Sequence, residues 1–137
     1  MANKTRTLVL AGSGLWCLII LAGAIFQVPA IYAFFSRICH QDPARSFHIA
    51  GTALPVCIRC SSVYLGFFLG VSFRCPMKWR YLELAIIATA LEFILALLFW
   101  DSPWLRATTG LALGTTSAPF VVHGIHEMIR GEIRGTV

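Results

Sequence analysis

The sequence has few charged residues, and very few of them are acidic. Asp, Glu, Lys and Arg make up only 12% of its 137 residues, and Asp and Glu together number six. Charged residues typically form about a quarter of a soluble domain, so this composition excludes an ordinary soluble domain. The sequence also lacks a glycine-rich nucleotide loop, a nucleophile–base constellation and a basic face with interleaved aromatic residues. We therefore expect no nucleic-acid partner.

Apolar residues are abundant instead, at 58% of the chain. They form four runs separated by polar or basic segments, at residues 7–26, 61–73, 81–100 and 105–125. About 20 helical residues cross a hydrocarbon core of about 30 Å. The runs therefore predict an all-α membrane protein: a bundle of about four transmembrane helices that forms a single integral membrane domain (1–137) in contact with the lipid bilayer.

The first apolar run and the residues that follow it each allow more than one interpretation. A secretory signal would have an apolar core of only 7–15 residues and a cleavage site, so the first run favours a membrane span. Residues 27–38 follow it, with Pro29 near their start. They are either a kinked extension of the first helix or a helix lying in the membrane interface.

The Lys and Arg residues predict an orientation. With the N-terminus inside, seven face the cytoplasm: Lys4, Arg6, Arg74, Lys78, Arg80, Arg130 and Arg134. Four then lie on the other side: Arg37, Arg45, Arg59 and Arg106. Because short cytoplasmic loops are enriched in Lys and Arg, we expect a multi-pass protein of the cell inner (cytoplasmic) membrane with both termini cytoplasmic.

The segment between the first two runs, residues 37–60, contains most of the chemistry-bearing side chains. Cys57 and Cys60 form a C-x-x-C pair at the beginning of the second predicted helix, where positions i and i+3 share a face. Cys39 and His40 precede them in the same segment. Three cysteines and a histidine are the ligands of a closed tetrahedral zinc site. His48 is an alternative fourth ligand, because adjacent residues such as Cys39 and His40 rarely bind one ion together.

Two other interpretations of these cysteines stay open. Cys57 and Cys60 could form a redox pair that exchanges electrons with a membrane quinone, with Cys39 as the resolving thiol. The protein would then be a thiol–disulfide oxidoreductase. Cysteines are also small buried hydrophobic residues, which suits Cys17 and Cys75 best.

The small size of the chain favours a component over a free-standing enzyme. It would be part of a membrane complex, or an accessory subunit of a respiratory or photosynthetic one. In that role it could contact other membrane protein subunits, a quinone or a tetrapyrrole. The oligomeric state stays open.

Several polar residues are expected to support the site or the bundle. Gln41, Arg45 and Arg59 flank the candidate ligands, and the two arginines would balance the negative charge of a thiolate site. Glu92 lies near the middle of the third run, where a carboxylate must face the bundle and be paired or protonated. An antiparallel hairpin places Arg106 about 10 Å nearer the outer surface than Glu92. We therefore expect Arg106 to pair with Asp101.

The antiparallel hairpin of the third and fourth runs also predicts what Glu92 contacts. We expect Glu92 to meet Thr109, Thr116 or Tyr64. Glycine pairs of the GxxxG type, residues 66–70 and 110–114, allow helices to approach closely. They are expected to pack against each other or against a partner chain.

The segments CHQDPARSF (39–47), LPVCIRCSSVYLGFFLG (54–70) and RATTGLALG (106–114) carry a family resemblance. The chain resembles small multi-pass membrane proteins of bacteria and archaea of unknown function. Those proteins are marked by C-H-Q-x-P-x-R-S-F and P-x-C-x-R-C-T-G-x-Y-x-G. Ser61 and Ser62 stand where the family usually has Thr-Gly. The resemblance implies the fold and the position of the site, and it implies no activity.

Overall fold

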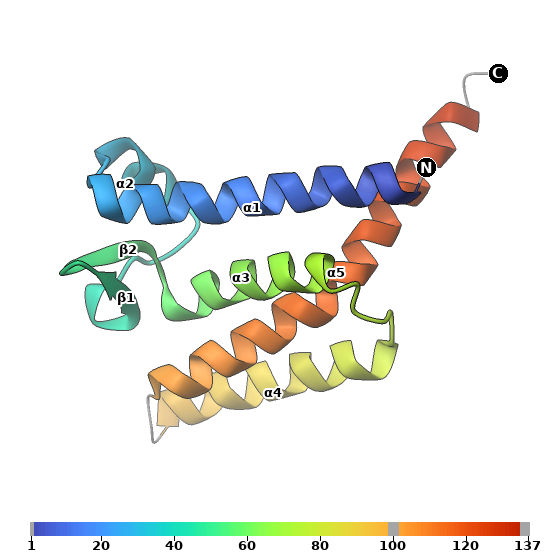
Figure 1. Cartoon of the computed structure of the whole chain (residues 1–137). Helices are drawn as coiled ribbons and strands as arrows, with labels where there is room; N and C mark the ends of the chain where they lie inside the picture. The colour runs from blue at the N-terminus through green and yellow to red at the C-terminus, as the bar shows by residue number, and fades with distance from the viewer. Residues whose placement is uncertain (1, 99–101, 135–137) are drawn as a thin grey trace.

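The structure is a computed structural model that describes residues 2–98 and 102–134. Within them the chain is mostly helical, with one small antiparallel sheet (Figure 1). The elements in chain order are α1 (Ala2–Phe26), α2 (Pro29–Phe35), the 3₁₀ turn η1 (Pro43–Arg45), β1 (Ser46–Ile49), β2 (Thr52–Cys57), α3 (Ile58–Ser72), α4 (Trp79–Leu98) and α5 (Pro103–Arg134).

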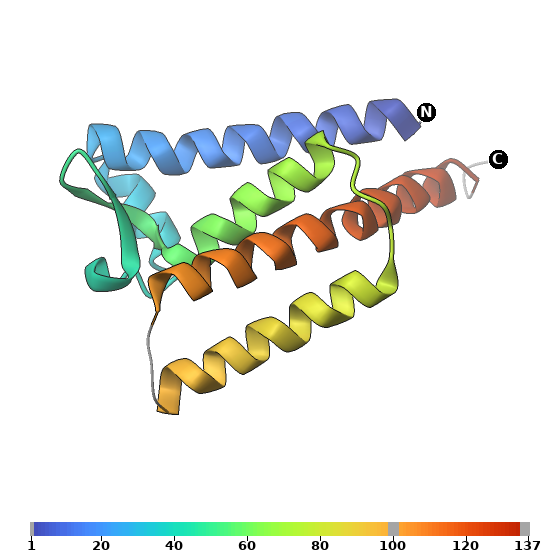
Figure 2. The same cartoon turned by 60° about the horizontal axis from the view of Figure 1, so that its bottom comes forward.

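The long helices α1, α3, α4 and α5 correspond to the four apolar runs. They lie alongside one another, and α2 with the two strands covers one end (Figures 1 and 2). The start of α1 and the end of α5 lie at the other end. Two helical stretches, Lys4–Phe26 and Trp79–Leu98, are long and apolar enough to cross a membrane. The apolar helix α3 is shorter, and α5 is longer than its predicted run.

The two candidate spans expose most of their apolar surface. Only 17% of the apolar window of the first and 11% of that of the second are buried in the protein. A helix in the core of a soluble protein would instead be mostly buried. Side chains such as Leu18, Leu84 and Leu97 point outward with more than half of their surface exposed. This surface suits lipid, which solvates apolar side chains directly.

The closest helix pair is α3 and α5, and glycines make that approach possible. A Cβ atom on Gly66 would overlap the carbonyl group of Leu111, and one on Gly114 would overlap the carbonyl group of Val63. The Thr115 hydroxyl also donates to the Gly66 carbonyl across the pair at 3.1 Å. The glycine pairs therefore pack against each other, which was one of the two alternatives that the sequence left open.

The sheet corrects the expectation of an all-α protein. β1 and β2 pair antiparallel, with Ile49 opposite Thr52. Between them stand Ala50 at φ 51° and Gly51 at φ 82°. Two positive φ angles in a two-residue connection are the mark of a type I′ hairpin turn. The turn lacks the usual Asn-Gly signal, because Ala occupies its first position, and the sequence therefore gave little sign of it.

The segment after α1 is a separate helix. α1 ends before Gln27, which has φ 50°, and α2 then starts with Pro29. Proline suits a first helical turn because its missing N–H has no partner to lose there. Phe35 of α2 is almost fully buried with Leu54 and Val56 of β2 against the end of α1. We call α2, β1 and β2 together the end cap, and this cap thus has an apolar core of its own.

Candidate metal centre

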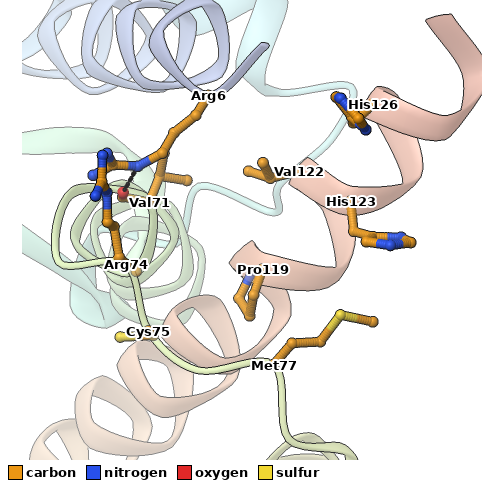
Figure 3. A pocket seen from close by; sticks show the side chains of 10 residues that line it. Arg6, Val71, Arg74, Cys75, Met77, Pro119, Val122, His123 and His126 are labelled. Atoms are coloured by element: carbon orange, nitrogen blue, oxygen red, sulfur yellow. Dashed lines mark hydrogen bonds between the residues drawn. The ribbon is translucent and has the colours of Figure 1, made fainter. Parts of the chain in front are cut away.

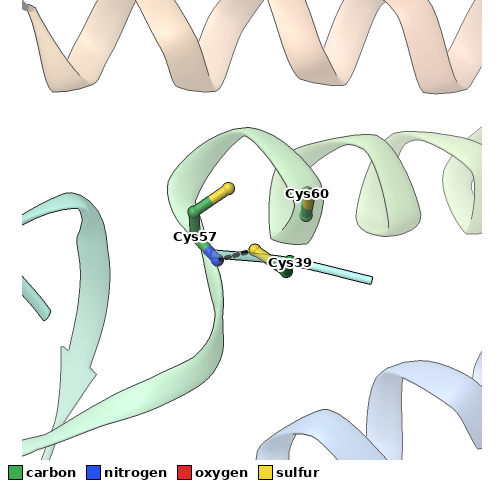
Figure 4. A group of neighbouring side chains, drawn as sticks. All are labelled: Cys39, Cys57 and Cys60. Atoms are coloured by element: carbon green, nitrogen blue, oxygen red, sulfur yellow. Dashed lines mark hydrogen bonds between the residues drawn. The ribbon is translucent and has the colours of Figure 1, made fainter. Parts of the chain in front are cut away.

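The sulfur atoms of Cys39, Cys57 and Cys60 all lie within 4.8 Å of one another (Figure 4). Among the described residues, these three form the one group of metal-ligand type. Cys39 follows α2, Cys57 ends β2 and Cys60 lies in the first turn of α3. Two segments of the end cap and the start of α3 therefore converge on one point.

Local backbone structure places each sulfur. The Cys39 N–H donates to the Phe35 carbonyl at 2.8 Å, which extends α2 by a turn. Cys57 is the N-cap residue of α3, with extended backbone angles. Its N–H donates to the Cys39 sulfur at 3.1 Å. This hydrogen bond joins the end of β2 to the segment that carries Cys39.

The electrostatics of the group favour a thiolate at Cys57. A hydrogen bond from the Cys60 side chain lowers the pKa of Cys57 to about 5, and partial burial opposes this effect. Its ordinary value is 9.0. Thiolate is the form that binds metal ions and also the form that attacks disulfides. The lowered pKa therefore suits both interpretations of the pair.

The spacing of the sulfurs can be compared with that of a zinc site. Zinc–sulfur bonds of about 2.3 Å in a tetrahedron separate the sulfurs by about 3.8 Å. Separations of at most 4.8 Å need shifts of about 1 Å or less to reach this value. Side-chain rotation alone provides shifts of this size. The three cysteines thus fit a tetrahedral ion with one further position to fill.

The other candidate ligands lie outside the sulfur group. His40 is exposed beside Cys39, and His48 is exposed on β1, where it pairs with Ala53. Neither imidazole is among the atoms that lie within 4.8 Å of one another. Cys17 in α1 and Cys75 after α3 are also outside the group, and both are half-buried free thiols.

Gln41 ties parts of the end cap together. Its side-chain amide donates to the Tyr32 carbonyl at 2.7 Å and to the Pro55 carbonyl at 2.9 Å. The Tyr32 hydroxyl donates to the Ala53 carbonyl at 2.6 Å. These bonds tie α2 to β2, the elements that carry Cys39 and Cys57. Gln41 thus helps to fix the positions of the elements that carry Cys39 and Cys57.

Arg45 and Arg59 have different surroundings. Arg45 is exposed, and its guanidinium lies 3.5 Å from the Asp42 carboxylate. Arg59 reaches the other way, toward α4, where it donates to Glu92. It also lies over the Phe93 ring at 5.5 Å. Arg59 therefore links the C-x-x-C turn to the third long helix.

The environment of Glu92 corrects the expected register. Glu92 is 3% exposed and faces the bundle, as its position in an apolar run predicted. Its carboxylate pairs with Arg59, and the Arg106 guanidinium lies 3.5 Å away. The expected partners Thr109, Thr116 and Tyr64 were wrong. Long arginine side chains reach along a bundle, so the level of a backbone position does not fix where its charge lies.

The sequence also predicted a pair of Asp101 and Arg106. Asp101 lies outside the described residues. Arg106 is itself buried, with 8% of its surface exposed. Sequence reasoning missed Arg59 as a partner of Glu92, although Arg59 stands inside the C-x-R-C motif. Its position between two cysteines favoured a role at the sulfurs.

Residues 39–120 match the family model described as "Predicted membrane protein (DUF2085)". The uncharacterized protein MJ1492 of Methanocaldococcus jannaschii is 35% identical over 111 residues, which cover 72% of this chain and 70% of that protein. An uncharacterized protein of Methanothermobacter thermautotrophicus is 34% identical over 89 residues, covering 58% of this chain and 80% of that protein. No solved structure matches the chain. The family match spans all three clustered cysteines.

Proposed function

The chain belongs to this family of predicted membrane proteins, and from that premise we propose that it uses Cys39, Cys57 and Cys60 to hold one structural zinc ion at the membrane surface. The convergence of three sulfurs within 4.8 Å is the observation that carries the proposal. Sulfur ligands select soft or borderline ions, and zinc is the common non-redox ion bound by several thiolates.

The ion would crosslink the end cap to α3. Its ligands come from the end of α2, the end of β2 and the first turn of α3, so one ion fixes the three elements relative to one another. Binding of a structural zinc ion contributes on the order of 10 kcal/mol in small zinc domains. The cap also has buried apolar side chains. We therefore expect loss of the ion to loosen the cap without unfolding the helices.

A fourth ligand completes the tetrahedron in this proposal. His40 and His48 are the candidates, and both have exposed side chains. Three thiolates, one neutral imidazole and Zn²⁺ carry a net charge of −1. Arg59, whose backbone lies between two ligands, offsets that charge in part, since Glu92 shares its guanidinium.

The proposal also includes four membrane spans, formed by α1, α3, α4 and α5, with the cysteines outside and both ends inside. α3 has 15 residues and is about 22 Å long, shorter than the hydrocarbon core. The first turn of α3 would therefore lie deeper in the membrane than the end of α1. The end cap would fill the space between that turn and the membrane surface. We also propose that the protein is a component of a larger membrane complex. This part of the proposal rests on the size and composition of the chain alone.

Metal analysis of the purified protein tests the site. We expect one zinc ion per chain in the wild type and in Cys75→Ser, which removes a half-buried cysteine outside the cluster. Cys57→Ser should bind close to none and should melt at a lower temperature. His40→Ala and His48→Ala identify the fourth ligand, because only one of them should weaken zinc binding.

The redox interpretation gives a different result in the same experiment. A metal-free wild type in which Cys57 and Cys60 cycle between dithiol and disulfide would overturn the zinc site. It would make a thiol–disulfide oxidoreductase the better proposal. Thiol counts before and after reduction, made on the same sample, distinguish the two outcomes.

A further inference from the structure

A second site lies at the end of the bundle opposite the cysteines. There a cavity of about 310 Å³ opens between the start of α1, the end of α3 and the later part of α5 (Figure 3). Small-molecule sites commonly start at about this volume. The sulfur group sits at the other end of α3, so the two sites are separate.

Basic side chains surround this cavity. Arg6 and Arg74 lie together on one side, and His123 and His126 of α5 lie on the other (Figure 3). Among the described residues that line the cavity, none is acidic. Glu127 lies beside His126 at 3.7 Å, and its side chain is exposed outside the lining. The described lining of the cavity is therefore basic.

The end of α3 holds Arg6 in place. Arg6 donates from Nε to the Val71 carbonyl at 2.9 Å and from Nη2 to the Ser72 carbonyl at 2.7 Å. These are carbonyls that a helix end leaves without partners. The Cys75 N–H donates to the Gly70 carbonyl at 3.2 Å, which closes the helix in a Schellman-type turn.

Arg74 occupies the left-handed position of that turn, with φ 53°. Glycine is the usual residue there, because a side chain costs about 1 kcal/mol or more in this conformation. An arginine at this point therefore has a conformational cost. Its side chain lines the cavity together with that of Arg6 (Figure 3).

The floor of the cavity is apolar. Val71, Met77, Pro119 and Val122 contribute most of it. A free inorganic anion gains nothing from such a floor, whereas an amphiphile gains from both the floor and the basic rim. The occupant that matches both parts carries a phosphate and an apolar body.

We propose that this cavity binds the headgroup and upper acyl region of an anionic phospholipid from the bilayer. Arg6 and Arg74 contact the phosphate from one side, and His123 and His126 donate to its oxygens from the other. The glycerol and first methylene groups rest on Pro119 and its apolar neighbours. Basic pockets between membrane helices suit anionic headgroups for the same electrostatic reason.

Native mass spectrometry of the full-length protein in nanodiscs tests the site. The probes are phosphatidylglycerol and phosphatidylcholine, and the variants are Arg74→Gln and a charge-matched control, Arg80→Gln. Arg80 is exposed at the start of α4 and does not line the cavity. We expect one retained phosphatidylglycerol in the wild type and in Arg80→Gln. A surface arginine contributes about fivefold to anionic-lipid binding, so Arg74→Gln should retain at least about fivefold less.

Three results would overturn the proposal. One is equal retention of phosphatidylglycerol by Arg74→Gln and Arg80→Gln, and another is equal retention of the two lipids by the wild type. The third is displacement of the lipid by millimolar inorganic phosphate, which would mean that the cavity takes a free anion. His123→Gln is a second variant, at a position outside the strained turn of Arg74. It should also lower the retention of phosphatidylglycerol. None of these results depends on zinc.

Discussion

Glu92 carries a carboxylate into the apolar middle of α4, where two arginines meet it from α3 and α5. Arg59 pairs with one carboxylate oxygen and Arg106 approaches the other. A single acidic side chain therefore joins α3, α4 and α5. Buried ion pairs add little net stability when complete, but loss of one partner leaves a buried charge and typically costs about 3–5 kcal/mol.

We predict that Glu92→Gln lowers the free energy of unfolding by about 3 kcal/mol, because an amide cannot balance the charge of two guanidiniums. Glu83→Gln is the matched control on the same helix, where the side chain is exposed. It should change stability by less than about 0.5 kcal/mol. Thermal or denaturant unfolding in detergent measures both.

A double variant tests whether the unpaired charge of Arg59 causes this loss of stability. Glu92→Gln combined with Arg59→Met should be less destabilised than the sum of the two single variants, since the methionine removes one of the stranded charges. Additive losses, or equal stability for Glu92→Gln and Glu83→Gln, would contradict the ion-pair account.

Among the elements, α3 and α5 show how small residues determine helix packing. Gly66 and Gly114 stand where the other helix's backbone comes too close for any Cβ atom. The sequence indicated close packing through its GxxxG pairs. It did not identify the partner helix, because the same motif serves contacts within a chain and between chains.

We predict that Gly114→Ala destabilises the protein by more than about 2 kcal/mol, since the new methyl group must push α3 and α5 apart. Gly124→Ala is the control in the same helix, because a Cβ there meets nothing within 4 Å. It should be neutral or stabilising by up to about 1 kcal/mol, as alanine favours helix. Equal effects of the two substitutions in an unfolding measurement would show that the α3–α5 contact is wrong.

The elements differ in how well the sequence predicted them. Long apolar runs predicted α1, α3, α4 and α5, because periodic apolar segments of this length have few alternatives. The short hairpin was missed, since Ala50 stands where the turn usually has Asn. Three cysteines were expected to converge, and they do. The partner of Glu92 could not be predicted, because it depends on how three helices are arranged in space.

At the scale of the whole molecule, the two ends of the bundle differ. One end carries the cap with the cysteines, and the other carries the start of α1, the end of α3 and the basic cavity (Figures 1 and 3). The larger share of Lys and Arg lies at the second end. An excess of these residues on the cytoplasmic side is the usual determinant of orientation.

We predict that alkaline phosphatase fused after Ser102 is active and that the same enzyme fused after Lys78 is inactive, because it folds only outside the inner membrane. Ser102 precedes α5 at the cap end, and Lys78 precedes α4 at the basic end. The opposite pattern would reverse the orientation. Activity at both points would contradict α4 as a membrane span.

X-ray absorption at the zinc edge of the purified full-length protein tests the central claim most directly. The account predicts a first shell of three sulfurs at about 2.3 Å with one nitrogen at about 2.0–2.1 Å, and the same shell in Cys75→Ser. In Cys57→Ser the sulfur count should fall or the metal should be lost. A wild-type shell of nitrogen and oxygen only, or purified protein without bound metal, would contradict the account.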